Sequence, residues 1–233
     1  MLFVMAGLVI GVVVFALIVN HRRPDESAFI RQFQQAHRNA QQAEPAAPAA
    51  QPEKPVLRLG RRDFHSHYTG WAKLDNWRGD IEISPELGEI SVLGSMRLDG
   101  DLRIGAGTIL RVAGELNAGG AIYVASILTC EKTIECGHSI HCGDSVEAGG
   151  SVFASGRIGC GRCLKAAGSI LAREDIRAGV EVSAGEAIHA GGTIESPIIA
   201  AGREGDPRTI TCKRLLRGRV NRGELVETGD GRG

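Results

Sequence analysis

Aliphatic residues recur at every sixth position along much of this chain. Leucine, isoleucine or valine occupies all seventeen positions of the series, which runs from Leu98 to Ile194. The position two residues further on holds alanine, valine, cysteine or serine, from Ala106 to Ser196. Because successive side chains of a β-strand point to opposite faces, the aliphatic and the small residue share one face, and the residue between them faces water. The pattern therefore predicts a series of short strands, one every six residues.

The period of six also predicts how these strands assemble. It drifts around a helix of about 3.6 residues per turn, so it excludes an α-helical repeat. The glycines that follow many of the strands allow the backbone to turn a corner. Three sides close a turn of about 18 residues, and turns stacked about 4.8 Å apart bury a continuous ladder. We therefore predict an all-β fold, a triangular β-solenoid (β-helix) over residues 98–201.

The hand of the solenoid follows from the polar residues. Left-handed hexapeptide solenoids also close each turn with three hexads, but in that family a small residue lies two positions before the aliphatic one. Here His138, Asp144 and Arg162 stand at that place. The right-handed form is therefore favoured.

The N-terminal segment has a different pattern, because residues 2–19 form an uncharged apolar run. As a helix it reaches roughly 27 Å, close to the thickness of a bilayer core. No basic residue precedes the run and no small-x-small cleavage site follows it, which favours a transmembrane helix over residues 2–20 rather than a cleaved signal peptide. His21, Arg22 and Arg23 flank its C-terminal side. They predict a single-pass protein of the cytoplasmic (inner) membrane, with the solenoid on the cytoplasmic side.

Two segments separate this anchor from the solenoid region. Residues 21–43 contain good helix formers with Phe29, Ile30 and Phe33 on one side, which predicts a juxtamembrane helix. Residues 44–56 mix four prolines with alanines, which predicts an extended Pro/Ala linker.

The segments on either side of the repeat are predicted to cover its ends. Residues 57–97 contain four aromatic residues and are interpreted as an N-terminal cap with lead-in strands. Residues 202–233 are interpreted as a basic C-terminal cap or tail. Six basic residues and no acidic ones lie between positions 208 and 222, and they are candidates for contact with a partner protein or with anionic lipid: Arg208, Lys213, Arg214, Arg217, Arg219 and Arg222.

The whole-chain charge does not indicate a partner, because 27 basic residues balance 27 acidic ones. Nucleic acid is disfavoured as the ligand of the basic segment, since no aromatic residues are interleaved with its arginines.

The cysteines follow the sixfold pattern. Four of the six occupy the small inward position that alanine fills elsewhere, which indicates packing in the core: Cys130, Cys136, Cys142 and Cys160. A metal site is the alternative, because Cys130, Cys136 and Cys142 lie on three successive sides of about one turn, where inward thiolates would approach one another. No cofactor is expected.

The alternation in "EISVLGSMRLDGDLRIGAGTIL", residues 89–110, followed by glycine-paced hexads, resembles the bactofilins, the polymer-forming cytoskeletal proteins of bacteria. The similarity covers residues 81–201. It implies a right-handed β-helix between terminal segments, end-to-end self-association without nucleotide, and attachment to the membrane through the N-terminal region.

The expected function is thus a membrane-anchored bacterial scaffold that associates with itself and positions partner proteins. The alternatives are an adaptor that does not polymerise and a hexapeptide-type acyltransferase. No catalytic residue is assigned and an enzyme is not expected, because the hexads contain no inserted loop that would shape a pocket.

Overall fold

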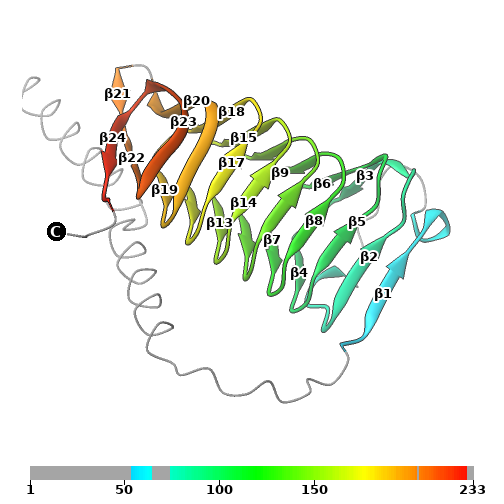
Figure 1. The fold of residues 1–233 in the computed structure, drawn as a ribbon. Coiled ribbons are helices and arrows are strands. Elements are labelled where there is room, and N and C mark those ends of the chain that lie inside the picture. The colour runs from blue at the N-terminus through cyan, green and yellow to red at the C-terminus, as the bar shows by residue number, and fades with distance from the viewer. Residues whose placement is uncertain (1–53, 65–73, 204, 230–233) are drawn as a thin grey trace, which may run out of the picture. The chain divides into compact units, whose positions relative to one another are not determined.

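The computed structural model of this 233-residue chain describes residues 54–64, 74–203 and 205–229. Over these residues the chain winds into a right-handed β-solenoid of about eight turns (Figure 1). A 3₁₀ turn, η1 (Arg61–Asp63), follows the first strand. The predicted β-helix with about 18 residues per turn is confirmed.

The strands form three sides, and strands one turn apart pair in parallel. Side 1 contains β1 (Val56–Leu59), β2 (Asp80–Ile83), β5 (Leu102–Ile104), β8 (Ile122–Val124), β11 (Ile140–Cys142), β14 (Ile158–Cys160), β17 (Ile176–Ala178) and the first part of β20 (Thr193–Arg203). Side 2 contains β3 (Gly88–Val92), β6 (Thr108–Val112), β9 (Leu128–Cys130), β12 (Val146–Ala148), β15 (Cys163–Ala166), β18 (Glu181–Ala184) and the last part of β20.

Side 3 contains β4 (Met96–Leu98), β7 (Leu116–Ala118), β10 (Ile134–Cys136), β13 (Val152–Ala154), β16 (Ile170–Ala172), β19 (Ile188–Ala190), β22 (Thr209–Cys212) and β24 (Glu224–Glu227). Two further strands complete the C-terminal end. β21 (Asp206–Pro207) pairs antiparallel with the end of β20, and β23 (Arg214–Arg222) runs parallel to β20 across sides 1 and 2.

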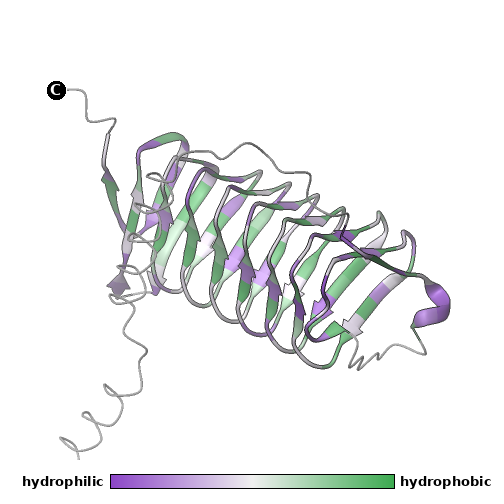
Figure 2. Cartoon of the chain, turned by 90° about the horizontal axis from the view of Figure 1, so that it is seen from below, coloured by the Kyte–Doolittle hydropathy of each residue, from purple (hydrophilic) through white to green (hydrophobic). Residues whose placement is uncertain are grey.

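The core is a stack of inward residues aligned from turn to turn. On side 3, Ile134 lies beside Val152 and Cys136 lies beside Ala154, and the members of each pair are one turn apart. All seventeen aliphatic positions of the sixfold series are buried, with exposed fractions of at most 5%. Hydrophobic and hydrophilic residues alternate along the coils in Figure 2. Each fully buried Leu, Ile or Val contributes about 1.5–3 kcal/mol to the free energy of folding, so this inward stack is the main source of stability.

The corners explain many of the glycines. The amide of Gly161 donates to the carbonyl of Cys142 in the preceding turn, 3.0 Å away. A β-carbon at Gly161 would collide with the carbonyl oxygen of Gly143, and one at Gly179 would collide with that of Gly161. Glycine is therefore needed here for the close approach of successive turns.

The sixfold series conceals a two-residue insertion. Leu98 and Ile104 lie beside Ala118 and Val124, so both occupy the small-residue position and not the aliphatic position that the sequence predicted. The two extra residues lie at the corner after Ile104, where Gly107 has a φ of 70°. The two inward positions of a strand are two residues apart. An insertion of two residues therefore shifts the sixfold series from the small-residue position to the aliphatic position, and the spacing of six is kept.

The first turns are accordingly longer than the later ones. The step from Leu102 to its partner Ile122 is two residues longer than the step from Leu110 to its partner Leu128. Ala106, predicted to point inward, is exposed at the enlarged corner. The expectation of hexads without an insertion is therefore wrong for the turn before residue 108.

The parallel ladder also extends beyond residues 98–201 at both ends. β1, β2 and β3 precede this range, and β22, β23 and β24 follow it. In the N-terminal region, Phe64 and Trp77 pack against the core, and Leu74 is fully buried. The C-terminal segment interpreted as a cap or tail contributes strands that continue the ladder.

Several sequence predictions concern residues outside the described ranges. These are the transmembrane helix over residues 2–20, the juxtamembrane helix over residues 21–43 and most of the Pro/Ala linker. Within the described residues, no helix is long and apolar enough to cross a membrane.

Candidate assembly surfaces

The C-terminal end of the solenoid is formed by β23 and β24. Val220 of β23 pairs with Ile199 of β20, and Leu225 of β24 pairs with Ile210 of β22. Across the described residues, no strand pairs with the other edge of β23 or β24. Within the described residues, the last turn therefore presents an edge without a strand partner on each of the three sides, although the amide of Leu215 donates to the carboxylate of Glu227 at 2.7 Å.

The basic residues predicted as a contact site gather at this end. Arg214, Arg217, Arg219 and Arg222 lie on β23, Lys213 immediately precedes it, and Arg208 immediately precedes β22. Arg208 pairs with Asp206 at 2.8 Å, and Arg222 donates to the carbonyl of Gly202 at 3.1 Å.

Three arginines of β23 make no ion pair within the described part of the chain, and all three are exposed: Arg214, Arg217 and Arg219. Exposed aliphatic residues lie among and beside them: Leu216, Leu225 and Val226 are 47%, 36% and 40% exposed. The β23 part of the C-terminal end is therefore a basic surface with apolar side chains in it, a composition that suits a partner with carboxylates, whereas β24 adds the exposed carboxylates of Glu224 and Glu227.

The N-terminal end has balanced charges. Arg58 of β1 pairs with Glu82 at 3.0 Å, and Glu89 of β3 pairs with Arg111 at 2.7 Å. Lys54 donates to the carbonyl of Asp99 at 2.9 Å. Each of β1 and β3 has a strand partner on one edge only, among the residues that the structure describes. The two ends thus share open backbone edges but differ in charge.

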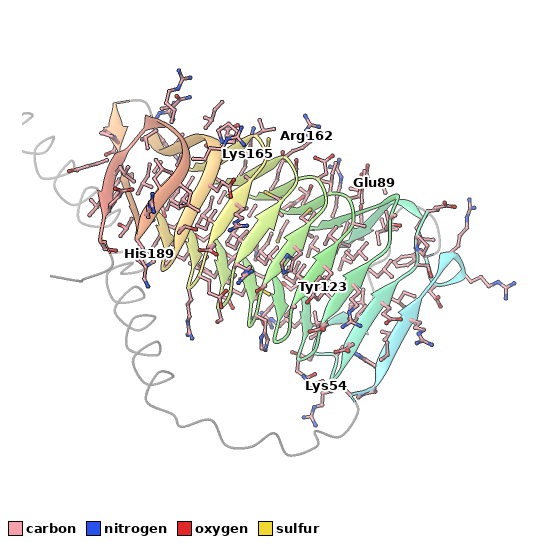
Figure 3. The ribbon with its side chains drawn as sticks, in the orientation of Figure 1. Lys54, Glu89, Tyr123, Arg162, Lys165 and His189 are labelled. Carbon is pink, nitrogen blue, oxygen red and sulfur yellow. The ribbon has the colours of Figure 1, made fainter. Side chains whose placement is uncertain are left out.

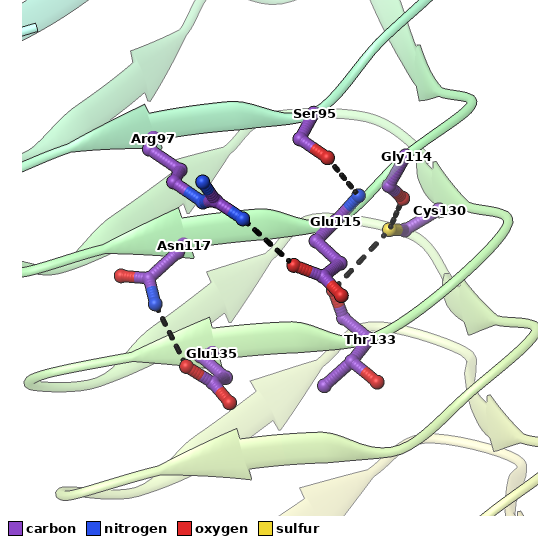
Figure 4. Close-up of polar contacts among 8 residues, drawn as sticks. All are labelled: Ser95, Arg97, Gly114, Glu115, Asn117, Cys130, Thr133 and Glu135. Atoms are coloured by element: carbon purple, nitrogen blue, oxygen red, sulfur yellow. Dashed lines mark hydrogen bonds and ion pairs between the residues drawn. The ribbon is translucent and has the colours of Figure 1, made fainter. Parts of the chain in front are cut away.

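The cysteine thiols point to three corners of the solenoid. The Cys130 thiol donates to the carbonyl of Gly114 at 3.1 Å, and a second carbonyl, that of Thr133, lies 3.5 Å away (Figure 4). Cys136 repeats this contact at the next corner and Cys142 at the one after, with closest carbonyls at 3.1 and 2.8 Å. The three side chains on successive sides are therefore not brought together.

Burial also keeps these thiols protonated. Desolvation raises the pKa of Cys136 to about 11 and that of Cys160 to about 12, and it raises the pKa of Cys130 and of Cys142. A thiol binds metal as its thiolate. In the part of the chain that the structure describes, no three His, Cys, Asp or Glu side chains form a group that could hold a metal ion. These four cysteines are part of the core.

One feature of the outer surface could not be predicted from the sequence pattern. Tyr123 and His141 stack on the outer surface of side 1, with ring centroids 5.4 Å apart and planes 7° from parallel. They are one full turn apart in the sequence, so their proximity becomes visible only when outward positions are compared turn by turn.

Comparison with protein-family models, with curated proteins and with solved structures finds no match for this chain. The solenoid geometry and its surfaces are therefore the basis for a functional conclusion.

Proposed function

We propose that this chain is a membrane-anchored, bactofilin-like structural scaffold whose solenoid associates end to end and positions partner proteins. The observation that carries the proposal is the pair of open ends. β1 and β3 at one end, and β23 and β24 at the other, each keep one edge without a strand partner among the described residues. Unblocked strand edges recruit further strands, so a second copy stacked on either end continues the ladder.

The charges favour contact between unlike ends. Two C-terminal ends brought face to face would oppose Arg214, Arg217 and Arg219 to the same arginines of the other copy, which is repulsive. The N-terminal end carries both signs of charge, with Glu86 and Glu89 exposed there as well as Arg61 and Arg62. A head-to-tail filament, in which β23 of one copy faces β1 and β3 of the next, avoids the repulsion.

Electron microscopy of the full-length chain in detergent tests the assembly. Head-to-tail stacking of about eight turns predicts filaments with an axial repeat of about 40 Å. The triple variant R214E/R217E/R219E should not form filaments, whereas His141→Asp on side 1 should form them normally. Discrete particles from the unmodified chain would contradict self-association and favour the adaptor, and acyl-CoA turnover by such particles would favour the acyltransferase.

The apolar run at residues 2–19 supports the membrane anchor. Residues 52–233 form one compact unit, so a variant that begins at Pro52 is a suitable comparison. In cell fractionation the full chain should remain in membranes after carbonate extraction, and the shortened chain should not. Equal distribution of both chains would contradict the anchor.

A further inference from the structure

The outward residues of side 1 form one continuous column, because each strand pairs in register with the next. Its members from the N-terminal to the C-terminal end are Arg58, Glu82, Arg103, Tyr123, His141, Gly159, Arg177 and Glu195.

Most members of this column contact a neighbour. Arg58 bonds to Glu82 at 3.0 Å. The guanidinium of Arg103 lies 5.8 Å from the centre of the Tyr123 ring, a cation–π distance. Tyr123, labelled on the outer surface in Figure 3, stacks in turn on His141. The column is thus a run of stacked planar groups as far as His141.

Gly159 interrupts the run. A β-carbon at Gly159 would meet only Nδ1 of His141, at 3.8 Å, so packing does not demand glycine here as it does at the corner residue Gly161. Its φ is not in the left-handed region either. Glycine inside a strand lowers stability and often marks a bulge, a tight bend or the close approach of a ligand or another backbone. Gly159 pairs in register on both sides, so it does not mark a bulge. One face of the His141 ring is left uncovered as a result.

The dimensions of the gap suit one planar ring. Gly159 pairs with His141 on one side and with Arg177 on the other, so those two residues are two turns apart, about 9.6 Å. A ring inserted midway lies about 4.8 Å from each, which is within stacking range of an imidazole and cation–π range of a guanidinium. The nearest ion pair, Arg177 Nε to Glu195 at 3.6 Å, lies on the far side of Arg177.

The gap is one end of an open groove of about 770 Å³, which runs along side 1 from Arg58 to Gly159. Small residues at the adjoining corner, Ala125 and Gly143, form its floor beside Tyr123 and His141. It extends over five turn intervals, about 24 Å, which suits an extended chain better than a compact small molecule.

We propose that this groove binds an extended segment of a partner protein and that an aromatic side chain of that segment fills the space over Gly159. A single-stranded nucleic acid would also offer rings for stacking, but Arg58, Arg103 and Arg177 of the column each already pair with a carboxylate, which weakens their attraction for its phosphates. The groove reaches the terminal strand β1 at one end, but the space over Gly159 lies in the middle of side 1, so occupation of that space is independent of end-to-end assembly.

The test uses the full-length chain in detergent and follows the His141 ring by NMR. N-acetyl-tryptophanamide should shift the His141 Hε1 signal upfield in a saturable manner, and N-acetyl-leucinamide should not. Gly159→Phe should abolish the shift because its own ring fills the gap, while the matched variant Gly159→Ser should retain it. An equal shift in Gly159→Phe, or with the leucine compound, would overturn the proposal. Unchanged melting temperatures establish that the variants fold.

A second measurement addresses the extended segment. A pentapeptide of four serines around a central tryptophan should bind about tenfold more tightly than N-acetyl-tryptophanamide, because its backbone also occupies the groove. Equal affinities would overturn the extended-segment proposal. A pentathymidylate that binds more tightly than the pentapeptide would overturn it in favour of nucleic acid.

Discussion

The middle of the solenoid and its two ends contain the same kind of short parallel strand, but they differ in the length of their turns and in how their strands are covered. From β6 to the start of β20, every turn has the same length of about 18 residues, and each inward residue is covered by a turn on both sides. At the ends the spacing changes, because the step from Ile81 to its partner Leu102 is longer and the step from Ile210 to its partner Leu225 is shorter. The middle thus supplies stability through repetition, whereas the ends, with open edges and exposed side chains, supply the surfaces for association.

The largest expected effect comes from placing a charge in the middle of the core. Ile140 is fully buried, so Ile140→Asp leaves an unpaired carboxylate there and should lower the free energy of unfolding by about 4 kcal/mol or more. The exposed neighbour His141→Asp should change it by less than about 0.5 kcal/mol. At the end, Leu225→Asp should also be tolerated. Urea denaturation measures all three, and equal losses would refute the inward and outward assignment.

The corner glycines give the next effect. Gly161→Ala forces a β-carbon against the preceding turn and should cost roughly 2–3 kcal/mol. Gly94 is the matched control, because it lies at a corner of the first turns and a β-carbon there meets nothing within 4 Å. Gly94→Ala should therefore leave the melting temperature unchanged. Similar losses for both variants would mean that the turns do not approach more closely in the middle.

Alkaline solution gives a smaller effect per residue, through the buried thiols. Desolvation raises the pKa of Cys136 to about 11 and that of Cys160 to about 12, from ordinary values of 9.0. The unfolded chain loses these protons above pH 9 while the folded chain keeps them, so stability should fall between pH 9 and 11, by roughly 2 kcal/mol for each of the two thiols. Denaturation midpoints of the double variant C136A/C160A should show a shallower decline. If the stability of the double variant falls as steeply with pH, other titrating groups cause the decline.

The smallest effect is expected from ion pairs on the outer surface, which should stabilise the middle and the ends equally little. Arg97 and Glu115 pair at 3.2 Å near the N-terminal end (Figure 4), and Arg157 and Glu174 pair at 3.1 Å in the middle. All four side chains are about half exposed, so each pair is worth less than about 1 kcal/mol. Double-mutant cycles measure both, and a much larger value in the middle would show that turn-to-turn ion pairs stabilise the repeat.

The core of the solenoid could be predicted from the sequence, but the places where the repeat is interrupted or exposed could not. The series around Ile140 predicted the strand, its inward face and the size of the turn, because one simple rule governs every buried position. The insertion after Ile104 was missed because the inward positions are themselves two residues apart. The strand β23 was missed because Leu216, Arg217 and Arg219 are exposed and so follow no buried pattern. The direction of the cysteine thiols depends on corner carbonyls, which periodicity does not encode.

The repeated turns of the middle of the solenoid affect how the length of the protein can evolve. Each turn contacts only its neighbours, so duplication or deletion of one turn alters the length by about 4.8 Å and leaves the two ends unchanged. The distance between whatever is bound at the two ends is therefore adjustable in fixed steps, while the chemistry of attachment stays the same. The number of turns therefore sets the distance between two partners bound at opposite ends.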